Sequence, residues 1–184
     1  MITREISPMN DAPAPQTPPA MPGDSKMIPT TIQERLGWKI TPELYETIRR
    51  LWIKHSIAED GRDLQGLIDT LTEDCVYEIP ATGQRWVGHD GARLFYTTFL
   101  GAFPDVKFNL TDIVIGPQGV FEVARMTGTH LGPWAGAEAS GKPVCTTVII
   151  FFPWNPAAAK FAGEKIYVDQ AAFGPGAPTR SAPQ

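Results

Sequence analysis

The chain has 184 residues, of which 42% are hydrophobic, 20% charged and 10% aromatic, with a formal net charge of −4. This composition is typical of a globular protein with a single core. No stretch approaches 18 consecutive apolar residues, and the first residues hold no apolar segment typical of a secretory signal. We therefore expect a cytoplasmic protein with no membrane partner. The acidic excess also disfavours nucleic acid as a partner, because binding to phosphates depends on clustered Lys and Arg.

The cysteine and histidine content argues against a metal centre. Two cysteines, Cys75 and Cys145, are too few for a disulfide framework or a four-thiolate zinc site. The three histidines, His55, His89 and His130, are too far apart in the sequence for metal-ligand spacing. We expect neither a metal nor a cofactor.

Proline marks the ends of the expected domain. Residues 1–37 are rich in proline and offer little apolar surface to bury, so they are expected to form an extended or disordered arm. Residues 174–184 have a similar composition and are expected to form a flexible tail. A single domain over residues 38–173 remains between them.

The first helix is expected to begin after Thr41. This residue can serve as the N-cap, Pro42 fits the first helical position, and the acidic Glu43 follows it. The helix then carries one apolar stripe, formed by Leu44, Ile48, Leu51 and Trp52. The next position on that stripe is His55, so we expect its side chain to point inward.

Two further helices are expected before residue 104. Asp63 can cap a short helix, and another helix should begin near Asp90 or Gly91. That last helix must end before Pro104, because the residue before a proline disfavours helical geometry. Its apolar face consists of Phe95, Phe99 and Phe103.

Five segments have the alternating or β-branched pattern that is typical of strands. They are Cys75–Ile79, Val106–Ile115, Val120–His130, Val144–Phe152 and Glu164–Phe173. The segment 153–163 is expected to be a long loop. Because the helices precede most of the strands, we expect an α+β domain with helices gathered on one face of a bent antiparallel sheet.

Several short motifs occur in a fixed order along the domain. They are WVGHDG at 86–91, AFPD at 102–105, GTHLG at 128–132, ASGKP at 139–143 and KIYVD at 165–169. Their order and spacing resemble the SnoaL-like branch of the nuclear transport factor 2-like superfamily over residues 44–173. This resemblance implies a cone-shaped barrel of curved antiparallel sheet, closed by about three N-terminal helices. It also implies a small-molecule substrate and a homodimer in which sheet packs on sheet.

Residues 63–67 and 78–80 also align with ketosteroid isomerases, which are distant members of the same superfamily. The alignment puts His55 where those enzymes keep a hydrogen-bonding tyrosine, which supports an inward position for this histidine. It puts Ile79 where they keep a general-base aspartate. Because isoleucine cannot take a proton, ketosteroid isomerisation by that mechanism is not expected.

The end of the chain resembles SnoaL-type polyketide cyclases. Their general acid–base aspartate lies on the last strand and matches Asp169. The histidine that these cyclases use on the preceding strand has no counterpart in Val144–Phe152. The chain also resembles the cofactor-free sphingomonad lyases that remove formaldehyde from lignin-derived diarylpropane diols, and its many aromatic residues would suit such a substrate.

The candidate catalytic residues are Asp169, His55, His130, Tyr77 and Arg125. Asp169 lies in an apolar segment, where a carboxylate is paired, neutralised or functional, although it could instead face solvent at an edge. The histidines could move protons near neutral pH, or be structural. Tyr77 and Arg125 could stabilise an oxyanion, but the first could equally pack in the core and the second could pair on the outside.

The candidate substrate-binding residues are Trp86, Tyr96, Trp134, Tyr167 and Ile79. The aromatic members could form the walls of a cavity, with core packing as the alternative. The leading hypothesis is a cofactor-independent enzyme that performs aldol or retro-aldol chemistry on an apolar molecule, as a lyase or a cyclase. The alternatives are a non-catalytic binding or dimerisation module and an epoxide hydrolase, for which only Arg125 and Asp169 are evident.

Overall fold

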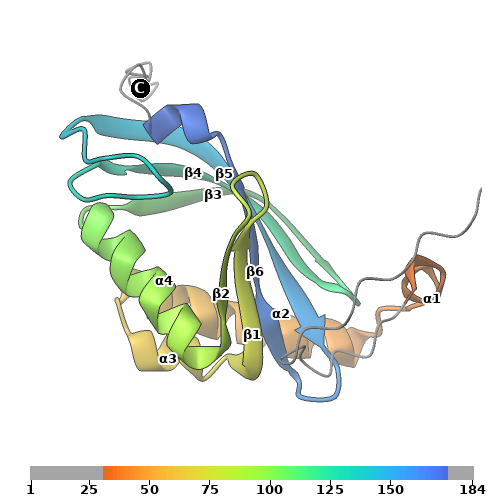
Figure 1. Ribbon diagram of the computed structural model, residues 1–184. Helices are drawn as coiled ribbons and strands as arrows, with labels where there is room; N and C mark the ends of the chain where they lie inside the picture. The colour runs from red at the N-terminus through yellow and green to blue at the C-terminus, as the bar shows by residue number, and fades with distance from the viewer. Residues whose placement is uncertain (1–30, 174–184) are drawn as a thin grey trace, which may run out of the picture.

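The computed structural model describes residues 31–173 (Figure 1). The segments expected as an arm at 1–30 and as a tail at 174–184 lie outside the described residues. Four α-helices and one 3-10 helix are present in the described part: α1 (Ile32–Leu36), α2 (Pro42–Asp60), α3 (Leu64–Ile68), α4 (Gly88–Ala102) and η1 (Gln170–Phe173). None of these helices has the length and apolar character needed to cross a membrane.

Local capping determines where α2 and α3 begin. The Thr41 hydroxyl accepts a hydrogen bond from the Leu44 amide (3.2 Å), and Pro42 occupies the first helical position. The Asp63 carboxylate accepts from the Gly66 amide at 2.9 Å. Both helix starts therefore confirm the predictions made from these capping residues.

Helix α4 is slightly longer than expected. It begins at Gly88 instead of near Asp90, and it ends at Ala102, before Pro104. Its Phe95 and Phe99 side chains are buried, so the predicted aromatic face does pack against the core.

Within residues 31–173, six strands form one sheet in the order β2-β1-β6-β5-β4-β3. Their bounds are β1 (Leu71–Ile79), β2 (Gln84–Val87), β3 (Lys107–Gly116), β4 (Gly119–Thr129), β5 (Pro143–Asn155) and β6 (Lys160–Val168). All neighbouring strands pair antiparallel except β1 and β6, which pair parallel. The sheet is curled but not closed, because β2 and β3 remain as its edges.

The α+β class and the curved sheet confirm the expected fold, while some local expectations are wrong. The segment 153–163 is not a long loop, because β5 and β6 extend into it and leave a turn at 156–159. Strand β2 was not predicted. Residues 32–36, within the segment expected to be extended, form the capped helix α1.

The end of the last strand also differs from the expectation. Strand β6 stops at Val168, and the chain turns into η1 instead of continuing extended to Phe173. The Asp169 carboxylate accepts from the Ala171 amide at 3.0 Å and so supports this turn. Asp169 therefore lies beyond the sheet.

The sheet bends around α2 and α4, which lie on its concave side (Figure 1). Alternate side chains of the central strands point toward these helices, since successive residues of a strand face opposite sides. Those of β5 and β6 include Val148, Ile150, Phe152, Glu164 and Ile166, all buried. The protein core and the cavity described next lie in this concave space.

Candidate active site

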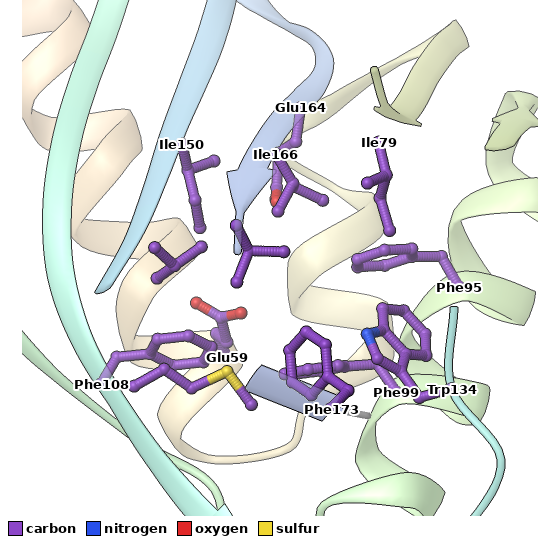
Figure 2. Close-up of a pocket in the computed structure, with 13 residues that line it drawn as sticks. Glu59, Ile79, Phe95, Phe99, Phe108, Trp134, Ile150, Glu164, Ile166 and Phe173 are labelled. Carbon is purple, nitrogen blue, oxygen red and sulfur yellow. The ribbon is translucent and has the colours of Figure 1, made fainter. Parts of the chain in front are cut away.

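A cavity lies inside the curl of the sheet, lined mainly by aromatic and aliphatic side chains (Figure 2). The empty space among them is about 420 Å³, including the part that opens to solvent, but the centre of a water molecule can occupy only about 30 Å³ of it. A ligand larger than a few atoms therefore requires some of these side chains to move. The lining consists of Glu59, Ile79, Phe95, Phe99, Phe108, Met126, Trp134, Val148, Ile150, Glu164, Ile166, Val168 and Phe173.

Helix α2 brings three polar side chains to the concave side. Trp52, His55 and Glu59 are spaced by three and four residues, so they lie on one face of the helix. The Trp52 indole donates to Glu122 on β4 at 2.8 Å. Glu59 reaches the cavity itself, and Figure 2 shows its carboxyl group pointing inward.

His55 and Glu164 form a fully buried pair. His55 Nε2 lies 3.0 Å from Glu164 Oε1, and the Tyr96 hydroxyl donates to the same oxygen at 2.7 Å. Tyr77 lies 3.2 Å from Tyr96, hydroxyl to hydroxyl. Because Tyr96 already donates to Glu164, Tyr77 must donate to Tyr96. Glu164 is the member of this network that lines the cavity.

The hydrogen bonds fix where the protons of this pair lie. The Thr70 hydroxyl donates to the Leu67 carbonyl (2.6 Å), so it must accept from His55 Nδ1–H at 2.7 Å. One further proton must lie between His55 Nε2 and Glu164 Oε1, since two lone pairs would otherwise face each other. The two side chains are therefore joined by one hydrogen bond and are coupled to each other.

Both tyrosines remain protonated near neutral pH. Burial raises the pKa of Tyr77 and of Tyr96 well above the usual value for a phenol, and the nearby Glu164 charge raises the pKa of each further. These hydroxyls can therefore donate hydrogen bonds or relay protons, but they cannot act as the initial base.

Two more carboxyl groups on the concave side are desolvated. Burial raises the pKa of Glu59 well above its ordinary value, and repulsion from Glu164 and Glu122 adds to this effect. Burial raises the pKa of Glu122 to about 7, although the hydrogen bond from Trp52 partly offsets it. The raised pKa favours the protonated form of Glu59, which can donate a proton. Within residues 31–173, no group of three His, Cys, Asp or Glu side chains is arranged to hold a metal ion.

Asp169 and Tyr167 do not lie in the cavity, so their expected positions are wrong. Asp169 is exposed in the turn before η1. Tyr167 is exposed on the outer face of the sheet, because its neighbours Ile166 and Val168 point inward. The buried carboxyl group of β6 is Glu164.

Arg125 and His130 are also outside the cavity lining. Arg125 lies on the outer face of β4, where its Nε donates to Cys145 Sγ at 3.1 Å. Asp169 and Arg125 therefore do not meet in the cavity, which removes the basis for the epoxide hydrolase alternative. His130 is fully buried and its ring stacks on Phe103, with Nδ1 3.4 Å from the Ser140 hydroxyl.

Other predicted residues do reach the cavity or its wall. Ile79 and Trp134 line it. Trp86 is half-buried and stacks on Trp134 with ring centroids 6.3 Å apart, so it supports the wall from behind. His55, Tyr77 and Tyr96 lie together in the network one layer deeper.

The carboxyl groups of Glu59 and Glu164 were not predicted as site residues, although the sequence holds a signal for each. Glu59 follows His55 by four residues and so continues the inward stripe of the helix. Glu164 precedes Ile166 by two residues and so shares its strand face. Both signals are weak alone, because a charged residue on either pattern is more often placed in solvent.

The fold resembles many solved structures. A protein of Jannaschia sp. CCS1 described as a SnoaL-like polyketide cyclase is 22% identical, with a TM-score of 0.61 over 77% of this chain and 100% of that one. TerC, co-crystallised with polyporic acid, is 14% identical, with a TM-score of 0.57 over 69% and 95%. A Kribbella flavida protein described as a ketosteroid isomerase is 16% identical, with a TM-score of 0.54 over 76% and 85%. At these identities the likeness concerns the fold.

The family comparison is more specific. No curated protein matches the chain in sequence. A family model, described as SnoaL-like polyketide cyclase, matches residues 43–174, which include the helices that follow α1, the sheet and the cavity described above. The chain belongs to the SnoaL-like polyketide cyclase family.

Proposed function

We propose that the protein is a cofactor-independent acid–base enzyme that acts on a small apolar molecule, of aromatic or polyketide-like character, by aldol or retro-aldol chemistry. The observation that carries this proposal is the buried His55–Glu164 pair, bound by Tyr96 and exposed to an aromatic cavity through Glu164. A general base needs this combination of a proton acceptor, an orienting partner and restricted access for water.

The residues suit a lyase that releases an aldehyde from a diarylpropane diol. Glu164, coupled to His55, would take the proton from the terminal hydroxyl. The adjacent carbon–carbon bond then breaks, and formaldehyde forms from the terminal carbon. The released electron pair forms a carbon–carbon double bond and expels the second hydroxyl, which leaves as water with a proton from Glu59. The products are a stilbene, formaldehyde and water, so the reaction needs no oxidant or reductant.

Turnover of a 4-hydroxylated 1,2-diarylpropane-1,3-diol tests this function. The wild-type protein should yield stilbene absorbance and an equal amount of formaldehyde. Glu164→Gln keeps the shape of the side chain and its bond from Tyr96 but removes the base, so it should lower kcat by at least about a hundredfold. The matched control is Asp169→Asn, which alters an exposed carboxylate and should leave kcat unchanged. Wild-type kcat in Glu164→Gln would remove Glu164 from the mechanism.

A non-catalytic binding module is the second candidate. The narrowness of the cavity favours it, as does the position of His55 and Tyr96 behind the lining. A binder would retain the diol without converting it, and its affinity would not change when Glu164 is replaced by Gln. Binding of the diol with no stilbene formed between pH 5 and 9 would therefore decide for this candidate.

We also propose that the outer face of the sheet binds a second copy of the chain. Phe121, Ile149, Phe151 and Tyr167 form a shallow apolar depression there, which would be covered in a homodimer with sheet packed on sheet. Exposed apolar patches of this kind are typical of association surfaces.

A further inference from the structure

We propose that the cavity selects uncharged aromatic alcohols and excludes their carboxylate analogues, with the Glu59 carboxyl group as the anchor of a ligand hydroxyl. This inference rests on the proposed function, because it concerns the substrate class of the same site. It predicts which of several otherwise similar molecules will bind.

The groups that line the cavity offer nothing that would stabilise an anionic ligand. Two of its lining side chains, Glu59 and Glu164, carry carboxyl groups, and among residues 31–173 no Lys, Arg or His belongs to the lining. Behind the lining, Glu122 adds a third carboxyl group. A carboxylate that enters this space loses its water and meets no compensating positive charge.

Two cationic groups near the cavity, His55 and Arg62, are already held by hydrogen bonds. His55 shares its proton with Glu164. Arg62 lies in an outer groove, where its guanidinium donates to the carbonyl oxygens of Pro104 and Val106 at 3.3 and 3.2 Å. Neither can turn to neutralise an anion in the cavity without breaking these bonds.

Glu59 offers an unused polar group to a neutral ligand. Its carboxyl group makes no hydrogen bond or ion pair with any residue in 31–173, although it is partly buried and points into the cavity (Figure 2). The surroundings are aromatic, with Phe108 and Phe173 on either side of it in the same view. A ligand hydroxyl can form a hydrogen bond with Glu59 in either protonation state of the carboxyl group, because a hydroxyl can both donate and accept.

The two polar groups of the cavity lie apart. Glu164 lies near Ile166, away from the Glu59 end (Figure 2). An apolar frame that carries a hydroxyl group at each of two positions would therefore match both groups. This pattern is the one a diol presents, and a purely hydrocarbon ligand would leave the Glu59 carboxyl group without a partner.

Titration calorimetry with three matched probes tests the inference at pH 7.5. The probes are 2,3-diphenylpropan-1-ol, 2,3-diphenylpropanoate and 1,2-diphenylpropane. The alcohol should bind at least about threefold more tightly than the hydrocarbon, through one additional hydrogen bond. The alcohol should bind at least about tenfold more tightly than the carboxylate. The carboxylate must enter the cavity either as an anion without a positive partner or as its protonated form, which is scarce at this pH. The carboxylate's affinity should rise about tenfold for each pH unit lowered from 8 to 6, as that form becomes commoner.

The variant Glu59→Leu tests the hydrogen bond of Glu59 to the ligand separately from the exclusion of anions. It removes a desolvated carboxyl group, so it should not impair folding, which the melting temperature checks. The alcohol should lose its advantage over the hydrocarbon, while the carboxylate stays excluded by Glu164. The matched control is Asp60→Leu, the adjacent exposed carboxylate, which should change no affinity.

The inference is overturned if the carboxylate binds as tightly as the alcohol, if its affinity does not depend on pH, or if none of the probes binds. Retention of the alcohol's full advantage in Glu59→Leu would overturn the role of Glu59. These measurements need no turnover. Selective binding of the alcohol by a protein that does not cleave the diol would therefore reject the proposed enzyme while supporting the selectivity.

Discussion

At the scale of residues, the concave side has an unusual charge balance. Three glutamates, Glu59, Glu122 and Glu164, face the same buried space, and His55 is the basic side chain that pairs with one of them. The other two carboxyl groups must carry protons or remain unpaired in a poorly solvated site. The site can therefore hold a base and an acid at the same pH, as acid–base catalysis requires.

The protonation of Glu122 should be visible in stability. Its pKa is about 7 in the folded protein and 4.5 in an unfolded chain. The folded state therefore binds more protons than the unfolded state between these values, so stability falls as pH rises from about 4.5 to 7 and is then level. Glu122→Gln removes this loss and can still accept from the Trp52 indole.

Urea unfolding of both proteins at pH 5 and pH 8 measures the effect. The free energy of unfolding of Glu122→Gln, relative to wild type, should increase by about 2–3 kcal/mol from pH 5 to pH 8. Groups common to both proteins cancel in this difference. If the difference in unfolding free energy between the two proteins is the same at pH 5 and at pH 8, the pKa of Glu122 is not raised.

The candidate site was only partly predictable at this scale. The inward position of His55 was predicted because four apolar residues on α2 define an inward stripe, and the regular period of a helix puts His55 on the same stripe. Asp169 was misplaced because β6 ends at Val168, and because the strand face that Asp169 would share with Tyr167 is the outer one. The turn that exposes Asp169 depends on its own hydrogen bond to Ala171, which an apolar sequence pattern does not reveal.

At the scale of elements, the orientation of Glu164 depends on the parallel pairing of β1 with β6. Gly163 has φ +117° and pairs with Val76 where the register of the two strands shifts. A Cβ at Gly163 would overlap the Val76 carbonyl oxygen. Only glycine fits here, so this close approach of two backbones positions the residue that follows it, Glu164.

Gly163→Ala should therefore affect both stability and activity. Positive φ and steric overlap together should lower the free energy of unfolding by about 3 kcal/mol, measured with urea. In the folded fraction, kcat should fall because Glu164 is displaced. The matched control is Gly101→Ala in α4, where a Cβ meets no atom within 4 Å. This variant should be as stable as wild type or gain up to about 1 kcal/mol. If both variants were equally stable, a side chain at residue 163 would be tolerated and the close approach at Gly163 would not require glycine.

The elements themselves were predictable where the signal is local. Caps such as Thr41 and Asp63 act within one helical turn, so the starts of α2 and α3 follow from a few residues. Strand pairing joins distant parts of the chain. The parallel β1–β6 pair and the short strand β2 depend on such partners, which the alternation of apolar and polar residues does not specify.

At the scale of the whole molecule, the curled sheet gives its two faces different roles. The concave face surrounds the cavity and the proton network, while the convex face carries an exposed apolar depression on β4, β5 and β6. Val114 is 65% exposed, Phe121 42% and Tyr167 43%. Pairing of Val114 with Phe121 across β3 and β4 makes these side chains part of one surface.

The convex face predicts self-association. At micromolar concentration, light scattering should give twice the mass of one chain, since sheet packing can bury the roughly 800 Å² per partner of a stable interface. Phe121→Glu places a charge in the apolar depression and should shift the protein to single chains, with little change in melting temperature. Leu94→Glu alters an exposed apolar residue on α4, away from this face, and should leave the mass unchanged. If wild type already has the mass of one chain, or if Phe121→Glu keeps the doubled mass, the convex face does not bind a second copy.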